Sequence, residues 1–320
     1  MKKPLFLILI FSFLCLANGI ADVKRDMANK LYEKYNIPKD YSLKLLNNYT
    51  YNKKIIELMN RPAEEKKWGY YKKLFLTEKM IKKGIYFYNK HKNLINEISI
   101  KFNVSPEILI SILGVESYYG DHRSNIRVLD ALGTLAFHYK RRSNYFIGEL
   151  EHFIYYTYKN KIDPYTIKGS YAGAIGMPQF MPSSIISFGY DYDGNGQVDL
   201  DKSLADSLAS TANFLKKHGW QDNMPTAILL YVPNKHNESL LLDKSFTVNR
   251  LKKLNIKFSL PINKNIKCSV IKTEDKDNKV NYWAIFKNFH VLKKYNPSNN
   301  YALVIILLAK KIEKYNEVIK

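Results

Sequence analysis

Apolar residues recur along this chain at the spacing typical of helices. Between residues 23 and 100 they stand three or four positions apart, as Leu43 and Leu46 do. This spacing places apolar side chains on one face of a helix. We therefore expect a helical N-terminal module over residues 22–84 and a long helix that runs from about residue 77 through residue 95 until Asn103 breaks it.

A strong helix start follows at Ser105, an N-cap residue that precedes Pro106 and the acidic Glu107. Proline has the φ angle of a first helical residue, and an acid in the first turn interacts favourably with the helix dipole. Asn103 separates this helix from the preceding one. Further helices are predicted between segments rich in Gly, Asp and Asn, over residues 129–139, 143–160, 182–187, 204–217 and 301–312.

The pattern changes between residues 222 and 289 to short β-prone runs separated by polar turns. These runs cover residues 227–232, 269–272 and 282–286. We expect a small antiparallel β module over residues 221–290, a central core over 85–220 and a C-terminal segment, 291–320, that returns to this core. The predicted fold class is α+β, mainly α.

The N-terminus has the layout of a secretory signal peptide. Two lysines precede an apolar run over residues 4–16, and small residues follow up to residue 21. The run is too short to span a bilayer. Cys15 follows Phe13 and Leu14 instead of small residues, so cleavage near residues 19–21 is favoured over a lipid anchor. We expect a signal peptide over 1–21 and a periplasmic protein whose one remaining thiol, Cys268, makes no internal disulfide.

Glu116 is the most conspicuous candidate for chemistry. In the helix that begins at Pro106, an apolar stripe precedes Glu116 on the same face, made of Ile108, Leu109, Ile112 and Leu113. Burial raises the pKa of a carboxyl, as a general acid requires near neutral pH. Gly114 and Gly120 leave room for a ligand nearby. The alternative is a glutamate at a fraying helix end, exposed or paired with Arg123 or Arg127.

The segment Gly-Val-Glu-Ser-Tyr-Tyr-Gly at 114–120 resembles the catalytic motif of the lytic murein transglycosylase B family. Further blocks resemble the same family in the same order over essentially the whole mature chain: 129–132, 141–150, 168–176, 179–184, 191–199, 218–220 and 295–302. The resemblance implies a peptidoglycan lytic transglycosylase whose core, residues 85–220, is lysozyme-like. It also implies that Glu116 is the proton donor and later the proton acceptor.

The same resemblance assigns further residues to substrate binding. Ser170 and Gln179 correspond to polar groups that line the cleft and orient the sugar without adding charge. Local capping of a turn and of a helix is the alternative for these two. Arg141 and Arg142 correspond to a basic pair suited to muropeptide carboxylates.

Aromatic cleft positions of the family are matched by Tyr71, Tyr295 and Tyr301. Since the chain has 25 tyrosines, an ordinary core or surface position is the alternative for each of them. At position 214 the sequence departs from the family, because Phe214 stands where a tyrosine is common and a phenolic hydrogen bond is lost there.

No convincing second carboxylate accompanies Glu116, whereas ordinary glycoside hydrolysis uses two. A lone acid is compatible with assistance from the substrate's N-acetyl group. The resemblance then implies cleavage of the β-1,4 bond between N-acetylmuramic acid and N-acetylglucosamine, with a 1,6-anhydro end as the product. Two alternatives stay open: a lysozyme-type muramidase that hydrolyses the same bond, and a non-catalytic peptidoglycan-binding protein.

Residues 191–197 begin like an EF-hand calcium loop. Asp191, Asp193, Asn195 and Gln197 supply oxygen ligands at alternating positions, with glycine at position six. Position twelve is Lys202 where a glutamate is expected, and the resemblance implies a longer loop closed by Asp206. We expect structural Ca²⁺ in this loop, 191–206, and no cofactor for catalysis. A turn without metal is the alternative.

Lys and Arg number 50 against 29 Asp and Glu, for a formal charge of +21. This excess predicts an anionic partner, for which peptidoglycan with its carboxylates is one candidate. Export and the absence of recognisable nucleic-acid motifs disfavour nucleic acid, while a genome biased toward Lys, Ile and Asn is another explanation of the charge. We expect a monomer, with outer-membrane or cell-wall synthesis complexes as protein partners.

Overall fold

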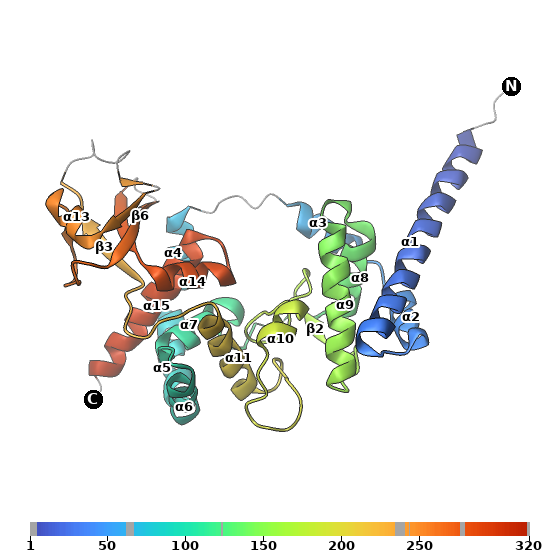
Figure 1. Ribbon diagram of the computed structural model, residues 1–320, viewed down its shortest axis with the longest axis horizontal. Helices are drawn as coiled ribbons and strands as arrows, with labels where there is room; N and C mark the ends of the chain where they lie inside the picture. Colours follow the sequence, from blue (N-terminus) through green and yellow to red (C-terminus); the bar gives the residue numbers. More distant parts are fainter. Residues whose placement is uncertain are drawn as a thin grey trace. The chain divides into compact units, whose positions relative to one another are not determined.

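The computed structural model of the protein describes residues 5–61, 67–122, 124–233, 241–242, 244–275 and 279–318. The chain forms two compact units, each assembled from separate stretches of sequence (Figure 1). Unit 1 comprises Met1–Pro62, Arg123–Gly189 and Gly194–Lys202, and unit 2 comprises Ala63–His122, Tyr190–Asp193 and Ser203–Lys320. The domain boundaries expected from the sequence, which are continuous segments, stay a prediction.

Among the residues of unit 1 that the structure describes, the regular elements are helices and a short two-stranded ladder. In this ladder β1 (Ile126–Arg127) pairs antiparallel with β2 (Lys168–Gly169). Helices α8 and α9 pack against each other, and α10 and α1 both contact α9. The helices are α1 (Leu5–Tyr35), α2 (Lys39–Asn47), α3 (Lys53–Asn60), α8 (Val128–His138), the 3-10 helix η1 (Lys140–Arg142), α9 (Ser143–Lys159) and α10 (Pro182–Phe188).

Unit 2 joins a helical part to a small sheet. Helix α7 packs against α15, α5, α6 and α11. The helices that the structure describes in this unit are α4 (Trp68–Phe75), α5 (Glu78–Lys90), α6 (Lys92–Phe102), α7 (Pro106–Ser117), α11 (Leu204–Lys217), α13 (Val248–Lys253), α14 (Lys287–Tyr295) and α15 (Asn299–Val318).

The sheet of unit 2 has the strand order β4-β6-β7-β3-β5, and all pairs are antiparallel. Leu241, Leu251 and Ala284 belong to its own buried apolar cluster. The small antiparallel β module is therefore confirmed, although the sequence pattern missed β4 and β5. The strands are β3 (Ala227–Tyr231), β4 (Ser245–Thr247), β5 (Lys257–Phe258), β6 (Lys267–Glu274) and β7 (Val280–Ile285).

The predicted long helix from about residue 77 to Asn103 is wrong, because two helices, α5 and α6, occupy this region. His91 lies between them with φ −118° and ψ 21°, and its N–H donates to the carbonyl oxygens of both Phe87 and Tyr88. No glycine or proline marks this break in the sequence. The break at Asn103 is confirmed, since Asn103 has the left-handed φ of 58° that ends α6.

The described part of α1 packs on α2 and on α9, with Met27 and Leu31 buried. Residues 1–4 and the side chains of residues 1–18, including Cys15, lie outside the described residues. The signal peptide over 1–21 therefore stays a prediction. Within the part of the chain that the structure describes, a single helix long and apolar enough to cross a membrane is not found.

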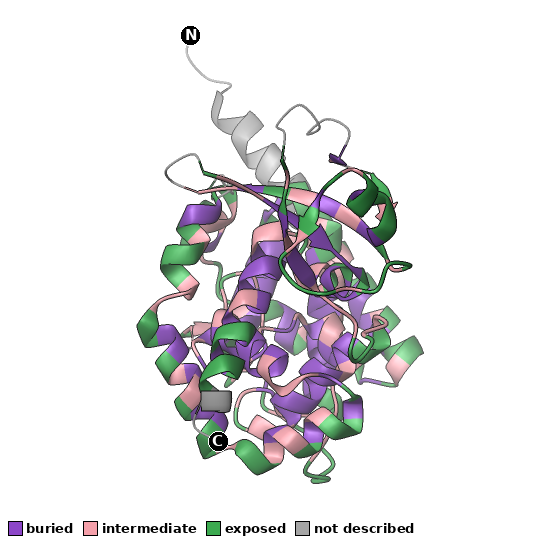
Figure 2. Ribbon diagram, turned by 90° about the vertical axis from the view of Figure 1, so that its left-hand side faces the viewer, coloured by how far each residue is buried: buried purple, intermediate pink, exposed green. Residues whose placement is uncertain are grey.

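Helix α7 is buried on all its faces, whereas the sequence suggested one apolar stripe. Ile110 and Ser111, which lie off that stripe, are both fully buried. Buried positions alternate with exposed ones along most of the peripheral helices (Figure 2). A helix enclosed by protein holds the residues of its last turn in defined positions. In α7 one of these residues is Glu116.

The chain after α7 turns sharply through two residues with left-handed backbone angles. Tyr118 has φ 54° and Tyr119 has φ 60°, and their N–H groups donate to the carbonyl oxygens of Gly114 and Leu113. The Tyr119 ring folds back under α7 and its hydroxyl donates to the Met80 carbonyl oxygen at 3.2 Å. Gly114 therefore makes space for the Tyr119 ring, and the expectation that it leaves room for a ligand is wrong.

We expect Gly114→Ala to destabilise the protein by about 1–3 kcal/mol, the usual cost of overpacking. A Cβ at position 114 would lie 2.6 Å from Cζ of Tyr119. The matched control is Gly148→Ala in α9, where a Cβ meets nothing within 4 Å and the helix gains stability. Urea unfolding of both variants measures the difference, and equal stabilities would contradict the packing described.

Candidate active site

Glu116 stands in the last turn of α7 and faces the first turn of α15. The Tyr301 hydroxyl donates a hydrogen bond of 2.7 Å to Oε1 of Glu116. Glu116 is partly buried, and Tyr301 is 4% exposed. The sequence separates these two residues by 185 positions, so the contact depends on the packing of α7 against α15.

The start of α15 fixes the direction of Tyr301. The Ser298 carbonyl oxygen accepts from the N–H of Ala302 at 3.2 Å, and its hydroxyl accepts from the N–H of Tyr301 at 3.4 Å. In turn the Asn296 side chain accepts from the N–H of Ser298 at 3.1 Å. Capping of this kind stabilises the first turn of a helix. The segment Asn296–Ser298 therefore holds the phenol that contacts Glu116.

Burial raises the pKa of Glu116 from 4.5 to about 7, and the hydrogen bond from Tyr301 acts in the opposite direction. Desolvation disfavours the charged carboxylate, while a donor to that carboxylate favours it. At neutral pH the carboxyl is thus divided between its two forms. The pKa values of Tyr295 and Tyr301 are raised, first by burial and then by the charge of Glu116, so both phenols keep their protons.

A cavity of about 220 Å³ opens beside this carboxyl. Of the described residues that line it, Glu116 alone carries a carboxyl. Helix α4 contributes aromatic side chains, and the ion pair of Lys72 with Asp275 at 3.2 Å joins α4 to the end of β6. The lining residues are Tyr70, Tyr71, Leu74, Phe75, Val115, Glu116, Asn296 and Tyr301.

The three tyrosines expected in the site lie in unit 2 with Glu116. Tyr71 and Tyr301 line the cavity, and Tyr295 stacks on Tyr301 with ring centroids 6.2 Å apart. Phe214 packs against Tyr295 at 4.9 Å and is 6% exposed. The departure from the family at this position therefore puts a buried ring behind Tyr295.

Sequence reasoning missed Tyr70, Phe75 and the direct role of Asn296 in the cavity. The spacing of Tyr71 and Phe75 in a helix puts both on one face, and that signal could have found Phe75. Tyr70 and Asn296 carry no pattern that distinguishes them from other tyrosines and asparagines.

Ser170 and Gln179 belong to unit 1, and both make local hydrogen bonds there. The Ser170 hydroxyl oxygen accepts from the N–H groups of Ala172 and Ala174 at 3.3 and 3.0 Å. These bonds use the oxygen of Ser170 as an acceptor and do not use its hydroxyl hydrogen. Gln179 has φ 51°, and its side-chain amide nitrogen donates to the Gly176 carbonyl oxygen at 2.8 Å. A non-glycine residue with positive φ is a strained position of the kind that clusters at functional sites.

Arg141 and Arg142 are both exposed and lie in η1 of unit 1. The Arg142 guanidinium stacks over the Tyr145 ring at 4.3 Å, which leaves its charge at the surface. Arg127, considered as a partner of Glu116, instead bonds Asp130 at 2.5 and 2.9 Å. Arg123 lies outside the described residues.

Other acids near these elements have structural partners. Glu149 accepts hydrogen bonds from the N–H and hydroxyl of Ser183 at 2.9 and 2.6 Å, which caps the start of α10. Glu151 pairs with Lys30 at 2.5 Å, and Asp121 pairs with Lys83. Each of these carboxylates therefore has a role in holding the fold.

Three carboxylates expected to bind metal converge in unit 2. Oxygen atoms of Asp191, Asp193 and Asp206 lie within 4.8 Å of one another, and Asp206 is completely buried. Like charges this close repel, and a hard cation with oxygen ligands would offset that repulsion. Asn195 and Gln197 belong to unit 1, where the Asn195 side chain accepts from the N–H of Gln197 at 2.9 Å. The acid set thus fits calcium.

A family model described as "Transglycosylase SLT domain" matches residues 20–310. The chain belongs to this family. The resemblance to lytic murein transglycosylase B is confirmed, since the chain is 33% identical over 240 residues to the membrane-bound lytic murein transglycosylase B of Escherichia coli (strain K12). That alignment covers 74% of this chain and 65% of the relative, so the chain spans less than two thirds of the relative's length.

Solved structures agree with this assignment. The catenated lytic transglycosylase SltB1 of Pseudomonas aeruginosa superposes with a TM-score of 0.84 at 29% identity, covering 91% of this chain and 97% of its own. The E. coli lytic transglycosylase Slt35 in complex with calcium gives a TM-score of 0.81 at 29% identity, with coverages of 92% and 93%. The expected fold class, α+β, mainly α and lysozyme-like, is confirmed.

We expect Glu116→Gln to gain stability relative to the parent protein as the pH rises from about 4 to 8. The pKa of Glu116 is raised on folding to about 7, so the folded parent binds more protons than the unfolded chain between pH 4.5 and 7. Its stability therefore falls over that window, by about 3 kcal/mol in total. The glutamine of the variant does not titrate, so the stability of the variant does not fall in this way.

Unfolding in urea across this pH range measures the effect. Glu97→Gln is the matched control, because Glu97 is exposed on α6 of the same unit. A constant difference between Glu116→Gln and the parent at every pH would contradict the raised pKa.

Proposed function

We propose that the protein is a peptidoglycan lytic transglycosylase with Glu116 as its single general acid and base. It cleaves the β-1,4 bond between N-acetylmuramic acid and N-acetylglucosamine. The observation that carries this proposal is the partly buried Glu116 carboxyl, whose pKa is raised to about 7. It lies beside a cavity whose described lining residues include no second carboxyl. Membership of the transglycosylase family supports it.

In the first step, protonated Glu116 gives its proton to the bridging oxygen, and the bond from this oxygen to C1 of N-acetylmuramic acid breaks. A raised pKa keeps the proton available near neutral pH. The substrate's N-acetyl oxygen stabilises the developing positive charge at C1, as in substrate-assisted glycosidases. Tyr301 meanwhile donates to the carboxylate that Glu116 becomes, a bond that is stronger to the charged form.

In the second step, the Glu116 carboxylate takes the proton of the C6 hydroxyl and the C6 oxygen bonds to C1. The product has a 1,6-anhydro end, no water is consumed, and Glu116 regains its proton. We assign Tyr71, Tyr295 and Tyr301 to substrate binding: Tyr71 and Tyr301 line the cavity, and Tyr295 supports Tyr301 by stacking on it. We assign Ser170 and Gln179 to orienting the substrate, and Arg141 and Arg142 to its peptide carboxylates.

We further propose that the protein acts in the periplasm after removal of residues 1–21, as a monomer. Its polymeric substrate is anionic, and the formal charge of +21 favours association with it. Membrane attachment of the E. coli relative, which its name states, supports a place in the cell envelope. Outer-membrane or cell-wall synthesis complexes are the protein partners we propose.

We expect purified sacculi digested by the protein to release muropeptides with 1,6-anhydro ends, and Glu116→Gln to lower their release at least about 100-fold, as loss of a general acid does. Mass spectrometry separates these products from muramidase products, which are heavier by one water. Glu97→Gln is the control. Hydrolysed ends would favour the muramidase, and binding without release would favour a non-catalytic protein.

We also propose that Asp191, Asp193 and Asp206, together with Asn195 and Gln197, bind structural Ca²⁺. Asp206 would supply the closing carboxylate, since Lys202 occupies position twelve. The three converging carboxylates support this proposal, and so does the calcium complex of Slt35. All the ligands are hard oxygens, so the ion would stabilise the loop and take no part in bond cleavage.

Calcium is expected to raise the Tm of the parent protein, with about 2.7 kcal/mol of stabilisation at a hundredfold excess over Kd. Asp206→Ala should abolish that rise. Asp201→Ala, in the same loop but outside the three converging carboxylates, should keep it. The parent protein is first treated with a chelator. If calcium then leaves its Tm unchanged, the proposed metal site is wrong.

A further inference from the structure

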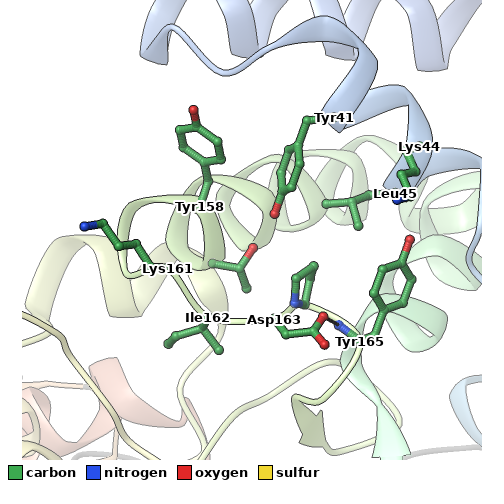
Figure 3. A pocket seen from close by; sticks show the side chains of 10 residues that line it. Tyr41, Lys44, Leu45, Tyr158, Lys161, Ile162, Asp163 and Tyr165 are labelled. Carbon is green, nitrogen blue, oxygen red and sulfur yellow. Dashed lines mark hydrogen bonds between the residues drawn. The ribbon is translucent and has the colours of Figure 1, made fainter.

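Unit 1 contains a second cavity, of about 490 Å³, between α2, the end of α9 and the segment that follows α9 (Figure 3). None of its lining residues lines the cavity beside Glu116. Its volume is within the range of small-ligand sites. The lining residues are Tyr41, Lys44, Leu45, Thr157, Tyr158, Lys161, Ile162, Asp163, Pro164 and Tyr165.

Three tyrosines from different elements surround this cavity (Figure 3). The rings of Tyr41 and Tyr158 meet edge to face, with centroids 5.2 Å apart. Tyr158 remains 40% exposed. Tyrosine combines an apolar face with a polar tip. Sugar rings present the same combination, with apolar faces and hydroxyl edges, so a saccharide matches this lining better than a purely apolar ligand.

Charged groups at the cavity add a preference for an anionic saccharide. Lys44 and Lys161 are both exposed, and neither forms an ion pair with any residue that the structure describes. An ammonium group binds a carboxylate as a compact point charge. Asp163 supplies carboxylate oxygens, which accept hydrogen bonds from hydroxyl groups.

The walls of the cavity are held in place before any ligand binds. Oδ1 of Asp163 accepts from the N–H of Tyr165 at 3.0 Å, and the Arg127 guanidinium lies 5.5 Å from the Tyr165 ring centroid. Arg127 is itself bonded to Asp130, which also accepts from the N–H of Thr50 at 2.7 Å. A site held in this way loses little entropy on binding.

We propose that this cavity is a non-catalytic binding site for a saccharide segment of an anionic glycan strand, with Tyr158 and Lys161 as main contacts. The identity of the strand as peptidoglycan rests on the proposed function. A polymer bound at one place is presented to a second place at a high effective concentration. The site therefore keeps the enzyme on its insoluble substrate between cleavage events.

The test uses full-length protein with Glu116→Gln, so that the strands stay intact, and measures co-sedimentation with purified sacculi. Adding Tyr158→Ala and Lys161→Ala should weaken binding about tenfold, as loss of two central contacts does. The matched control adds Tyr86→Ala and Lys90→Ala, which remove the same side chains from an exposed face of α5. Equal binding by both sets of variants would overturn the proposal.

A second measurement separates this site from the catalytic one and from misfolding. With Glu116 intact, the Tyr158→Ala and Lys161→Ala variant should cleave a short soluble muropeptide-bearing oligosaccharide at the parent rate and digest sacculi more slowly. Equal losses on both substrates would overturn the proposal. If the parent releases no anhydro product while the first test shows the loss of binding, the proposed function fails and the binding site stands.

Discussion

The central physical constraint on this molecule is the removal from water of one carboxyl group at the end of a buried helix. Burial removes water from Glu116, which destabilises its charged form and raises its pKa to about 7. The hydrogen bond from the Tyr301 hydroxyl stabilises the charged form in part. A carboxyl left fully hydrated would be almost entirely ionised at neutral pH, and one without a donor would resist giving up its proton. The balance between these two effects allows the same group to act first as an acid and then as a base.

The fold supports that balance by fixing the positions of both Glu116 and Tyr301. Helix α7 is enclosed by other helices, and it ends in two residues of left-handed conformation, Tyr118 and Tyr119. The Tyr119 ring packs against Gly114 and thereby supports the last turn of α7. On the other side, Ser298 caps α15 where it presents Tyr301. Holding the carboxyl in this position lowers the stability of the fold at high pH, since a buried charge is costly above its pKa.

The sequence predicted the elements with regular periodicity well, including α7, α8, α9 and α11 and the central strands of the sheet. It did not predict the break at His91, because the features that mark it are backbone angles without a glycine or proline signal. It identified Glu116 as an acid on the apolar face of a helix. It could not find the Tyr301 contact from spacing, since 185 positions separate the two residues and only the family resemblance suggested Tyr301. The fit of Tyr119 against Gly114 likewise depends on three-dimensional packing that no local pattern encodes.

Titration of the Glu116 carboxyl itself gives the sharpest test of its raised pKa. Carbon-13 NMR of protein labelled at glutamate carboxyls, with the resonance assigned by comparison with Glu116→Gln, follows this one group in the parent and in Tyr301→Phe. We expect a pKa near 7 in the parent and a higher pKa in Tyr301→Phe, because a hydrogen bond to the charged form is lost. A parent carboxyl that titrates at the ordinary glutamate value, unchanged by Tyr301→Phe, would contradict this expectation.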